Sequence, residues 1–204
     1  MISDLTPADI EAVLDFWFGD EPDDRRLADS RRDLWWSGKP EVDARIAPFA
    51  PLRSRLIAAA SGPAPEMPDA LLTRILLVDQ FSRALFRGTP AAFEHDPLAL
   101  QWCLQGLGAG LDQRLPPIRR VFFYLPLEHA ESMPLQDRCL ALYQSLLVEV
   151  PAAYRRLYSS YVDFARRHRE VIARFGRFPP GNRVLGREST AEEADFLLQP
   201  GSSF

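Results

Sequence analysis

Residues 154–175 read YRRLYSSYVDFARRHREVIARF, and this stretch gives the clearest sign of the fold. Its apolar residues recur at steps of three and four, which is the spacing of one face of an α-helix. A single histidine, His168, lies on that apolar face, among Tyr154, Leu157, Tyr158, Tyr161, Phe164, Ala165, Val171, Ile172 and Phe175. The stretch therefore predicts one long amphipathic helix with a titratable ring on its buried side.

The same spacing runs through the rest of the chain. It predicts further helices at about 7–18, 25–37, 40–61, 68–86, 97–106, 117–124, 134–149 and 190–198, with a short one before residue 97. We find no convincing alternating strand and no Asn-Gly hairpin signal. The sequence predicts an all-α protein, an antiparallel array of about nine or ten helices that is solenoid-like or bundled.

Prolines and capping residues set the expected ends of these helices. Thr6 precedes the first helix as an N-cap, and Thr190 with Glu193 three residues later forms a capping-box pattern before the last one. Pro48 is expected to bend the helix at 40–61, and Pro126 to break or kink the one that starts at 117.

Length and composition favour a single helical domain over residues 1–204, with a soft boundary at the proline-rich linker 61–68.

Cys103 and Cys139 have neither CxxC nor metal-ligand spacing, so we interpret them as buried thiols of a reducing compartment. The amino terminus lacks a signal-peptide pattern, and no apolar run approaches about 18 residues. A cytoplasmic protein without a membrane partner is expected.

The net charge of −4 is unevenly distributed. Residues 1–50 hold twelve acidic against six basic side chains, whereas residues 151–187 hold nine arginines against two acids. The overall acidity argues against nucleic-acid binding. The basic carboxyl-terminal region is expected to meet either an anionic ligand or the acidic amino-terminal half of the same chain.

Three long motifs resemble a known family. They are DQFSRALFRGTP at 79–90, FFYLPLEH at 122–129 and HREVIARFGRFP at 168–179, flanked by VLDFWF at 13–18 and LGREST at 185–190. Together they resemble a mainly bacterial family, domain of unknown function 924, over nearly the whole chain. The resemblance implies an all-helical, tetratricopeptide-like fold, and it implies no activity.

The positions that match this family and carry polar groups are the candidate site residues. They are Asp79, Gln80, Arg83, Arg87, Glu128, His129, His168, Arg174, Arg177, Asn182 and Arg187.

The histidines have two interpretations. His168 is either a hydrogen-bonded core residue or a general base. Glu128 and His129 are adjacent, and adjacent helical residues point about 100° apart, so we expect them to serve different neighbours. Glu128 with His168 is a possible cross-helix pair. One hypothesis is therefore a hydrolase or transferase that uses His168 or His129 with Glu128 as an acid–base pair.

Asp79 interrupts an apolar run, and Arg83 lies four residues further on the same helix face. Their spacing predicts a buried ion pair that holds helices in register. Alternatively, Arg83 and Arg87 project into a pocket and bind a carboxylate or phosphate, with Asp79 orienting them.

The loop at 174–187 is rich in arginine, glycine and proline. Its arginines either hold carbonyl and carboxylate groups of the protein, or form an anion cradle from Arg174, Arg177, Asn182 and Arg187. No phosphate-loop or dinucleotide pattern is present, which argues against nucleotide binding of a known type.

Our first hypothesis from the sequence is a helical binding protein for an anionic small molecule or acidic peptide. The enzyme described above is the second hypothesis, and the third is that the motifs serve only the fold.

With three histidines and no ligand spacing, we expect no metal and no cofactor. Oligomeric state cannot be read from the sequence. Trp35 and Trp36 are adjacent and cannot both face one core, so one of them is expected to line a groove or an oligomer contact.

Overall fold

A computed structural model describes residues 5–59 and 66–202. Within these residues every regular element is helical and no strand occurs, so the all-α prediction is confirmed. The α-helices are α1 (Pro7–Trp17), α2 (Asp24–Trp36), α3 (Pro40–Asp43), α4 (Ala50–Ala58), α5 (Pro68–Ile75), α6 (Phe81–Leu85), α7 (Asp96–Gly108), α8 (Pro117–Glu128), α9 (Met133–Glu149), α10 (Arg155–Phe175) and α11 (Ala191–Leu197).

Shorter helical segments join several of these helices. They are the 3₁₀ turns η1 (Ala44–Phe49), η3 (Pro90–Ala92), η4 (Asp112–Arg114), η5 (Ala152–Tyr154) and η6 (Pro179–Gly181), and the π-helical segment η2 (Leu76–Gln80). The tetratricopeptide-like arrangement stays a prediction. The linker expected at 61–68 falls largely outside the described residues, because 60–65 are not described.

Capping residues set helix ends as the sequence indicates. The side chain of Thr6 accepts from Asp9 N while the Asp9 carboxylate accepts from Thr6 N, and Thr190 with Glu193 does the same before α11. The helix predicted at 40–61 is interrupted, because Pro48 lies in the 3₁₀ turn η1 between α3 and α4.

Pro126 was expected to break or kink the helix, and the break is wrong: α8 continues through this residue to Glu128. Proline has no N–H to donate to the carbonyl four residues earlier, which normally weakens a helix. Burial offsets that loss, since every residue from Arg120 to Glu128 is buried in the packed centre of the molecule. The continued helix brings Glu128 and the following His129 into the interior.

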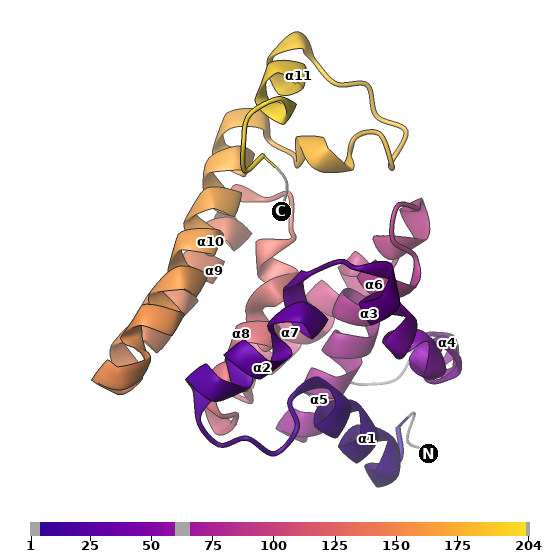
Figure 1. Ribbon diagram of the computed structural model, residues 1–204, viewed down its shortest axis with the longest axis vertical. Helices are drawn as coiled ribbons and strands as arrows, with labels where there is room; N and C mark the ends of the chain where they lie inside the picture. The colour runs from indigo at the N-terminus through magenta and orange to yellow at the C-terminus, as the bar shows by residue number, and fades with distance from the viewer. Residues whose placement is uncertain (1–4, 60–65, 203–204) are drawn as a thin grey trace.

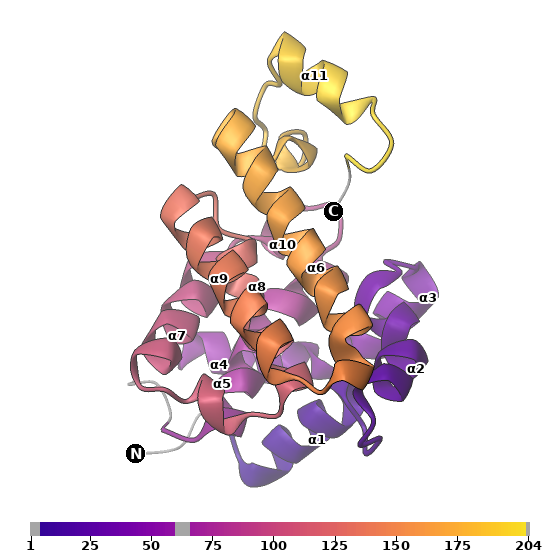
Figure 2. The same ribbon diagram turned by 90° about the vertical axis from the view of Figure 1, so that its left-hand side faces the viewer.

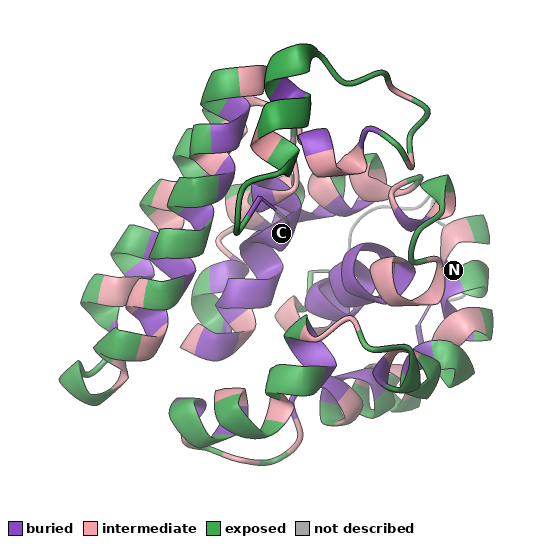
Figure 3. Ribbon diagram, turned by 45° about the horizontal axis from the view of Figure 1, so that its top comes forward, coloured by how far each residue is buried: buried purple, intermediate pink, exposed green. Residues whose placement is uncertain are grey.

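The centre of the molecule is formed by α5, η2, α7 and α8, which pack against one another. Their facing side chains have no exposed surface; examples are Leu71, Leu76, Trp102, Val121 and Phe123. Both cysteines are buried there and unpaired. Figure 3 shows the buried residues where the central helices meet and the exposed ones along the outer faces.

Helices α9 and α10 run side by side along one flank, and α9 also packs on α8 (Figures 1 and 2). The predicted apolar face of α10 is the one that packs inward, and His168 is buried on it. Beyond the end of α10, η6 and α11 form a small lobe at the opposite end of the molecule from α1 (Figures 1 and 2). The contiguous apolar core ends at Ala165, so this lobe lies outside it.

Candidate functional site

Asp79 lies in the one segment of the long helix from Pro68 to Leu85 that is not α-helical. Leu76–Gln80 form a π-helical turn, in which the N–H of Phe81 reaches back five residues to the carbonyl of Leu76. Such turns occur frequently at functional sites. The Asp79 side chain is completely buried, between apolar residues that are themselves buried. A carboxylate in this setting requires partners.

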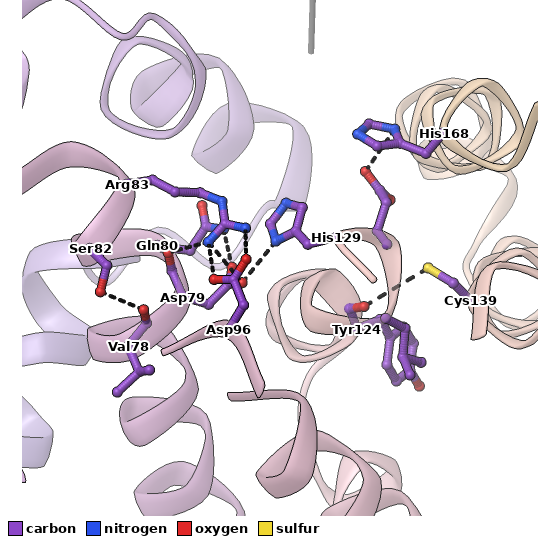
Figure 4. Close-up of polar contacts among 12 residues, drawn as sticks. Val78, Asp79, Gln80, Ser82, Arg83, Asp96, Tyr124, His129, Cys139 and His168 are labelled. Atoms are coloured by element: carbon purple, nitrogen blue, oxygen red, sulfur yellow. Dashed lines mark hydrogen bonds and ion pairs between the residues drawn. The ribbon is translucent and has the colours of Figure 1, made fainter. Parts of the chain in front are cut away.

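Three side chains supply those partners (Figure 4). His129 Nδ1 lies 2.8 Å and Arg83 Nη1 lies 3.2 Å from Asp79 Oδ1, while Gln80 Nε2 donates to Oδ2 at 2.6 Å. Burial by itself would raise the pKa of the Asp79 carboxyl, but the charge of Arg83, the imidazole of His129 and these hydrogen bonds hold that pKa well below its usual range. Asp79 is therefore ionised.

Arg83 joins this group to a second helix. Its two terminal nitrogens donate to both carboxylate oxygens of Asp96, at 3.0 and 2.9 Å, and Nη1 also donates to the backbone carbonyl of Asp79 at 2.9 Å. Asp96 is the first residue of α7. The guanidinium thus fixes the π-helical turn against α7. We refer to Asp79, Arg83, Asp96 and His129 as the core cluster.

His129 caps the carboxyl-terminal end of α8 and is the imidazole of the core cluster. An ionised carboxylate only accepts hydrogen bonds, so Asp79 selects the tautomer with the proton on His129 Nδ1. Nε2 has no hydrogen-bond partner among the described residues, and the side chain keeps 19 % of its surface exposed. The free nitrogen is therefore the acceptor that solvent can reach.

Glu128 points away from its neighbour, toward α10. Glu128 Oε1 lies 3.4 Å from His168 Nδ1, which donates to the carbonyl of Phe164 at 3.0 Å. Burial raises the pKa of the Glu128 carboxyl to about 8, with a further contribution from the negative charge of Asp79, and burial lowers the pKa of His168 to about 4. At neutral pH the pair is a protonated acid beside a neutral imidazole and not an ion pair.

Of the two pairings of the hypothesis, the structure brings Glu128 to His168, the cross-helix pair considered from the sequence, and not to His129. His129 contacts Asp79 and lies between Asp79 and His168 in Figure 4. The divergence of Glu128 and His129 follows from the 100° between successive helical residues.

The predicted arginine site is divided among several places. Arg87 binds Asp43, with contacts of 2.6 and 3.0 Å, near the end of α2. In the carboxyl-terminal lobe Arg174 pairs with Glu192, Arg177 with Glu193, and Arg187 with Glu131. Each guanidinium therefore already has a carboxylate partner. We refer to these three pairs as the C-terminal clamp.

Asn182 is buried inside the clamp. Its side-chain nitrogen donates to Ser189 Oγ at 3.1 Å and approaches Glu193 Oε2 at 3.4 Å, while its Oδ1 has no hydrogen-bond partner. Arg187 also donates to the carbonyl of Phe178 at 3.1 Å, and the ring of Phe178 contacts that of His168. The clamp therefore covers one side of His168.

Sequence reasoning missed two residues that organise the site. Asp96 gave no signal, because an acidic residue in the first turn of a helix is ordinary capping chemistry. Gln136 is fully buried and donates to the carbonyls of Glu128, at 2.6 Å, and Ala130, at 2.9 Å, which fixes the turn after α8. Gln136 lies three residues before Cys139 and seven before Tyr143, so the sequence places it on the apolar face of that helix. A polar residue on an apolar face is a signal that could have identified it.

Two surface hollows lie away from the core cluster, and the second of them borders the clamp at Arg174. One, of about 560 Å³, is lined by Leu147, Val148, Arg155, Arg156 and Ser159, and the other, of about 320 Å³, includes Arg174, Phe175 and Phe196. Within residues 5–59 and 66–202 no set of three or more His, Cys, Asp and Glu side chains is grouped to hold a metal ion. In the same residues no helix combines the length and hydropathy needed to cross a membrane.

Comparisons with known proteins bear on the family and on the fold. The profile of the family described as "Bacterial protein of unknown function (DUF924)" matches residues 13–201. Among curated proteins none matches the chain. A solved structure, a protein of unknown function, ATU0120 from Agrobacterium tumefaciens, is 33% identical, with a TM-score of 0.73, over 96% of this chain and 100% of that one. The order of the motifs, the helical fold and this match agree, and the chain belongs to the bacterial DUF924 family.

Proposed function

We propose that the protein is an acid–base enzyme, a hydrolase or transferase in which Asp79 and His129 act together on a proton of the reaction. The supporting observation is the 2.8 Å contact between Asp79 Oδ1 and His129 Nδ1, made by a carboxylate with no exposed surface. A carboxylate in this position orients the imidazole and stabilises its protonated form, which leaves the second nitrogen to exchange protons with a substrate.

In the proposed reaction, Nε2 of His129 accepts the proton of a water or hydroxyl group as its oxygen attacks the substrate. Asp79 stays ionised throughout and stabilises the imidazolium, since Arg83 contributes to keeping the carboxyl pKa low. The imidazolium then returns the proton to the leaving group. The enzyme neither gains nor loses a proton over the cycle.

Glu128 is proposed as a second proton-carrying group of the same site. Two carboxyl groups whose surroundings push their pKa values apart are typical of acid–base sites. Here Asp79 is held ionised, while the pKa of about 8 keeps Glu128 protonated at neutral pH. In this proposal His168, at 3.4 Å from the Glu128 carboxyl, positions that acid.

A second candidate function, binding of an anionic small molecule or acidic peptide, is supported by Arg83. Its guanidinium lies beside His129 in Figure 4, and its side chain is 20 % exposed. A ligand carboxylate or phosphate there would replace Asp96 as the bidentate partner. The remaining predicted arginines have partners elsewhere, so this candidate needs only one arginine and not a pocket lined by all of them.

We also propose a cytoplasmic location. Its support is the pair of buried, unpaired thiols of Cys103 and Cys139, which suits a reducing compartment.

The acid–base proposal is tested with p-nitrophenyl acetate, p-nitrophenyl phosphate and acetyl-alanine p-nitroanilide as probes of ester, phosphoester and amide cleavage. For a probe that is cleaved, His129→Gln and Asp79→Asn are expected to lower kcat/KM by roughly 100-fold or more. Arg174→Ala, in the clamp, is the matched control and should leave kcat/KM unchanged. Cleavage that survives His129→Gln intact contradicts the proposal.

A test that needs no substrate is the tautomer of His129. ¹⁵N NMR of the imidazole is expected to show the proton on Nδ1 in the wild-type protein. An Nε2-protonated ring would mean that Asp79 does not orient His129 for catalysis, and the motifs would then serve the fold alone.

A further inference from the structure

The two adjacent tryptophans at the end of α2 have opposite environments. Trp35 is buried, and its indole N–H donates to the carbonyl of Trp17 at 3.0 Å. Trp36 keeps 49 % of its surface exposed, and among the described residues its indole N–H has no partner. Trp35 holds the end of α2 on the core, so the placement of Trp36 is fixed by its neighbour.

The exposed tryptophan is supported from one side only. Its ring lies nearly parallel to that of Phe122, with 5.5 Å between ring centroids and 12° between planes, and the edge of Trp35 approaches it at 6.2 Å. Phe122 is fully buried, so it cannot move aside. Trp36 therefore presents one flat indole face that is covered and one that is open.

Phe122, which covers the other face of Trp36, lies on the same side of α8 as His129. Phe122 and His129 are seven residues apart on α8, so their side chains leave the helix in directions that differ by about 20°. The same spacing places their backbones about 10 Å apart along the helix axis. Leu125 and Pro126, which lie between them, are buried.

The chain that follows α2 passes close to Arg87. A Cβ atom at Gly38 would lie 3.3 Å from the guanidinium of Arg87, which Asp43 fixes through two hydrogen bonds. Arg87 follows α6, four residues after Arg83. The end of α2 is thus in contact with α8 through Trp36 and Phe122, and the residue Gly38 that follows it lies close to Arg87.

We propose that the open face of Trp36 is a binding surface for a flat aromatic or heteroaromatic ring of the substrate, whose reacting bond lies at His129. This inference rests on the proposed acid–base function and names its substrate class. A flat ring suits this surface because offset stacking requires a planar partner and a ring that cannot rotate away. The separation of about 10 Å along α8 requires a spacer of a few bonds between ring and reacting bond.

The test uses the full-length protein and two matched probes, benzamide and cyclohexanecarboxamide, which differ in the planarity of the ring. The indole N–H signals of the four tryptophans are followed by ¹H–¹⁵N NMR, and Trp36 is assigned by its loss in Trp36→Phe. Benzamide is expected to move the Trp36 signal saturably. Cyclohexanecarboxamide is expected to leave it in place.

Variants localise the effect. Trp36→Leu should weaken benzamide binding by roughly tenfold, measured by ligand-observed NMR, because one stacked aromatic pair is lost. Phe164→Leu is the control, since Phe164 is exposed to the same degree, 48 %, but lies on α10. Equal binding to wild type and Trp36→Leu overturns the inference, as does an equal response to both probes.

Self-association is the other explanation of an exposed tryptophan. A Trp36 signal that moves with protein concentration in the absence of probe would assign this face to a second copy of the chain and overturn the inference.

The same titration in His129→Gln separates this inference from the proposed function. Benzamide binding at Trp36, together with probe cleavage that His129→Gln leaves intact, supports the ring surface and removes the acid–base proposal. Cleavage that depends on His129 without benzamide binding at Trp36 does the reverse.

Discussion

The core cluster and the C-terminal clamp use the same chemical groups in different surroundings. Both contain an arginine with a bidentate carboxylate partner, Arg83 with Asp96 and Arg177 with Glu193. In the core cluster the central carboxylate, Asp79, has no exposed surface and lies among apolar side chains, whereas the clamp lies beyond the end of the apolar core. Glu193 of the clamp is also buried, so neither ion pairing nor burial by itself distinguishes a site from a structural clamp. The difference lies in the surroundings, because Asp79 is enclosed by the apolar core and Glu193 lies beyond its end.

This difference has an energetic consequence. A buried charge that loses its partner is stranded in a poorly polar medium, but an exposed one is solvated by water. We expect changes in the core cluster to act on the whole fold. Changes in the clamp should act on the carboxyl-terminal lobe.

The largest expected effect comes from Asp79→Ala. It leaves Arg83 and His129 without their shared carboxylate and opens a cavity in the π-helical turn, so the free energy of unfolding should fall by about 3–5 kcal/mol. Urea denaturation followed by circular dichroism measures it. A loss below about 1 kcal/mol, the size typical of an exposed pair, would remove the distinction between the two regions.

The second effect is a pH dependence near neutral pH that only the core-side pair Glu128 and His168 should have. The pKa of Glu128 rises from 4.5 to about 8 on folding, so between these values the folded protein holds a proton that the unfolded chain has lost. Stability then falls as pH rises, by roughly 1.4 kcal/mol per pH unit. The lowered pKa of His168 acts in the opposite sense below its ordinary 6.5, so the net fall should appear between pH 6.5 and 8.

Glu128→Gln is the matched control for this profile, because the amide copies the shape of the protonated acid and does not titrate. Thermal unfolding at several pH values compares the two proteins. Identical profiles above pH 6.5 would show that Glu128 is already ionised in the folded state.

A smaller, local effect is expected from Glu193→Gln in the clamp. Glu193 accepts from Arg177 and from the backbone N–H of Thr190, and the hydrogen bond from Arg177 is the main cause of its low pKa, about 2. The substitution should speed hydrogen exchange of residues 176–200 several-fold and leave α5 and α8 unchanged. Faster exchange throughout the protein would mean that the lobe folds as one unit with the core.

The smallest effect is expected from Arg174→Ala. Its partner Glu192 is exposed, and such pairs contribute at most about 1 kcal/mol, which salt screens. The midpoint of urea unfolding should change little, and 1 M NaCl should abolish any difference from wild type. A large loss of stability that salt does not change would mean that Arg174 behaves like the buried residues of the core cluster.

Much of the fold could be predicted from the sequence because helix formation depends on residues three and four apart. The periodicity of residues 154–175 gave α10, and capping residues gave the starts of α1 and α11. The error at Pro126 has the same origin: local propensity predicts a break, and burial of α8 on both sides overrides it.

The candidate site was predicted in its members and in two of its contacts, Asp79 with Arg83 and Glu128 with His168, whereas the contact of His129 with Asp79 was not predicted. Asp79, Glu128, His129 and His168 were singled out because they are polar residues on apolar segments, and that signal is local. Whether they catalyse a reaction stays a prediction. The arginines at 174–187 were selected for their charge density, and charge density does not reveal whether a carboxylate is already bound.

The sequence by itself determined which segments are helices, which face of each is apolar, and which polar groups interrupt those faces. Only the tertiary structure decided that His129 meets Asp79, fifty residues away, that Glu128 meets His168, and that Glu131 holds Arg187. The physical reason is that a helix is set by neighbours within one turn, whereas a pair between distant segments depends on how the helices pack together.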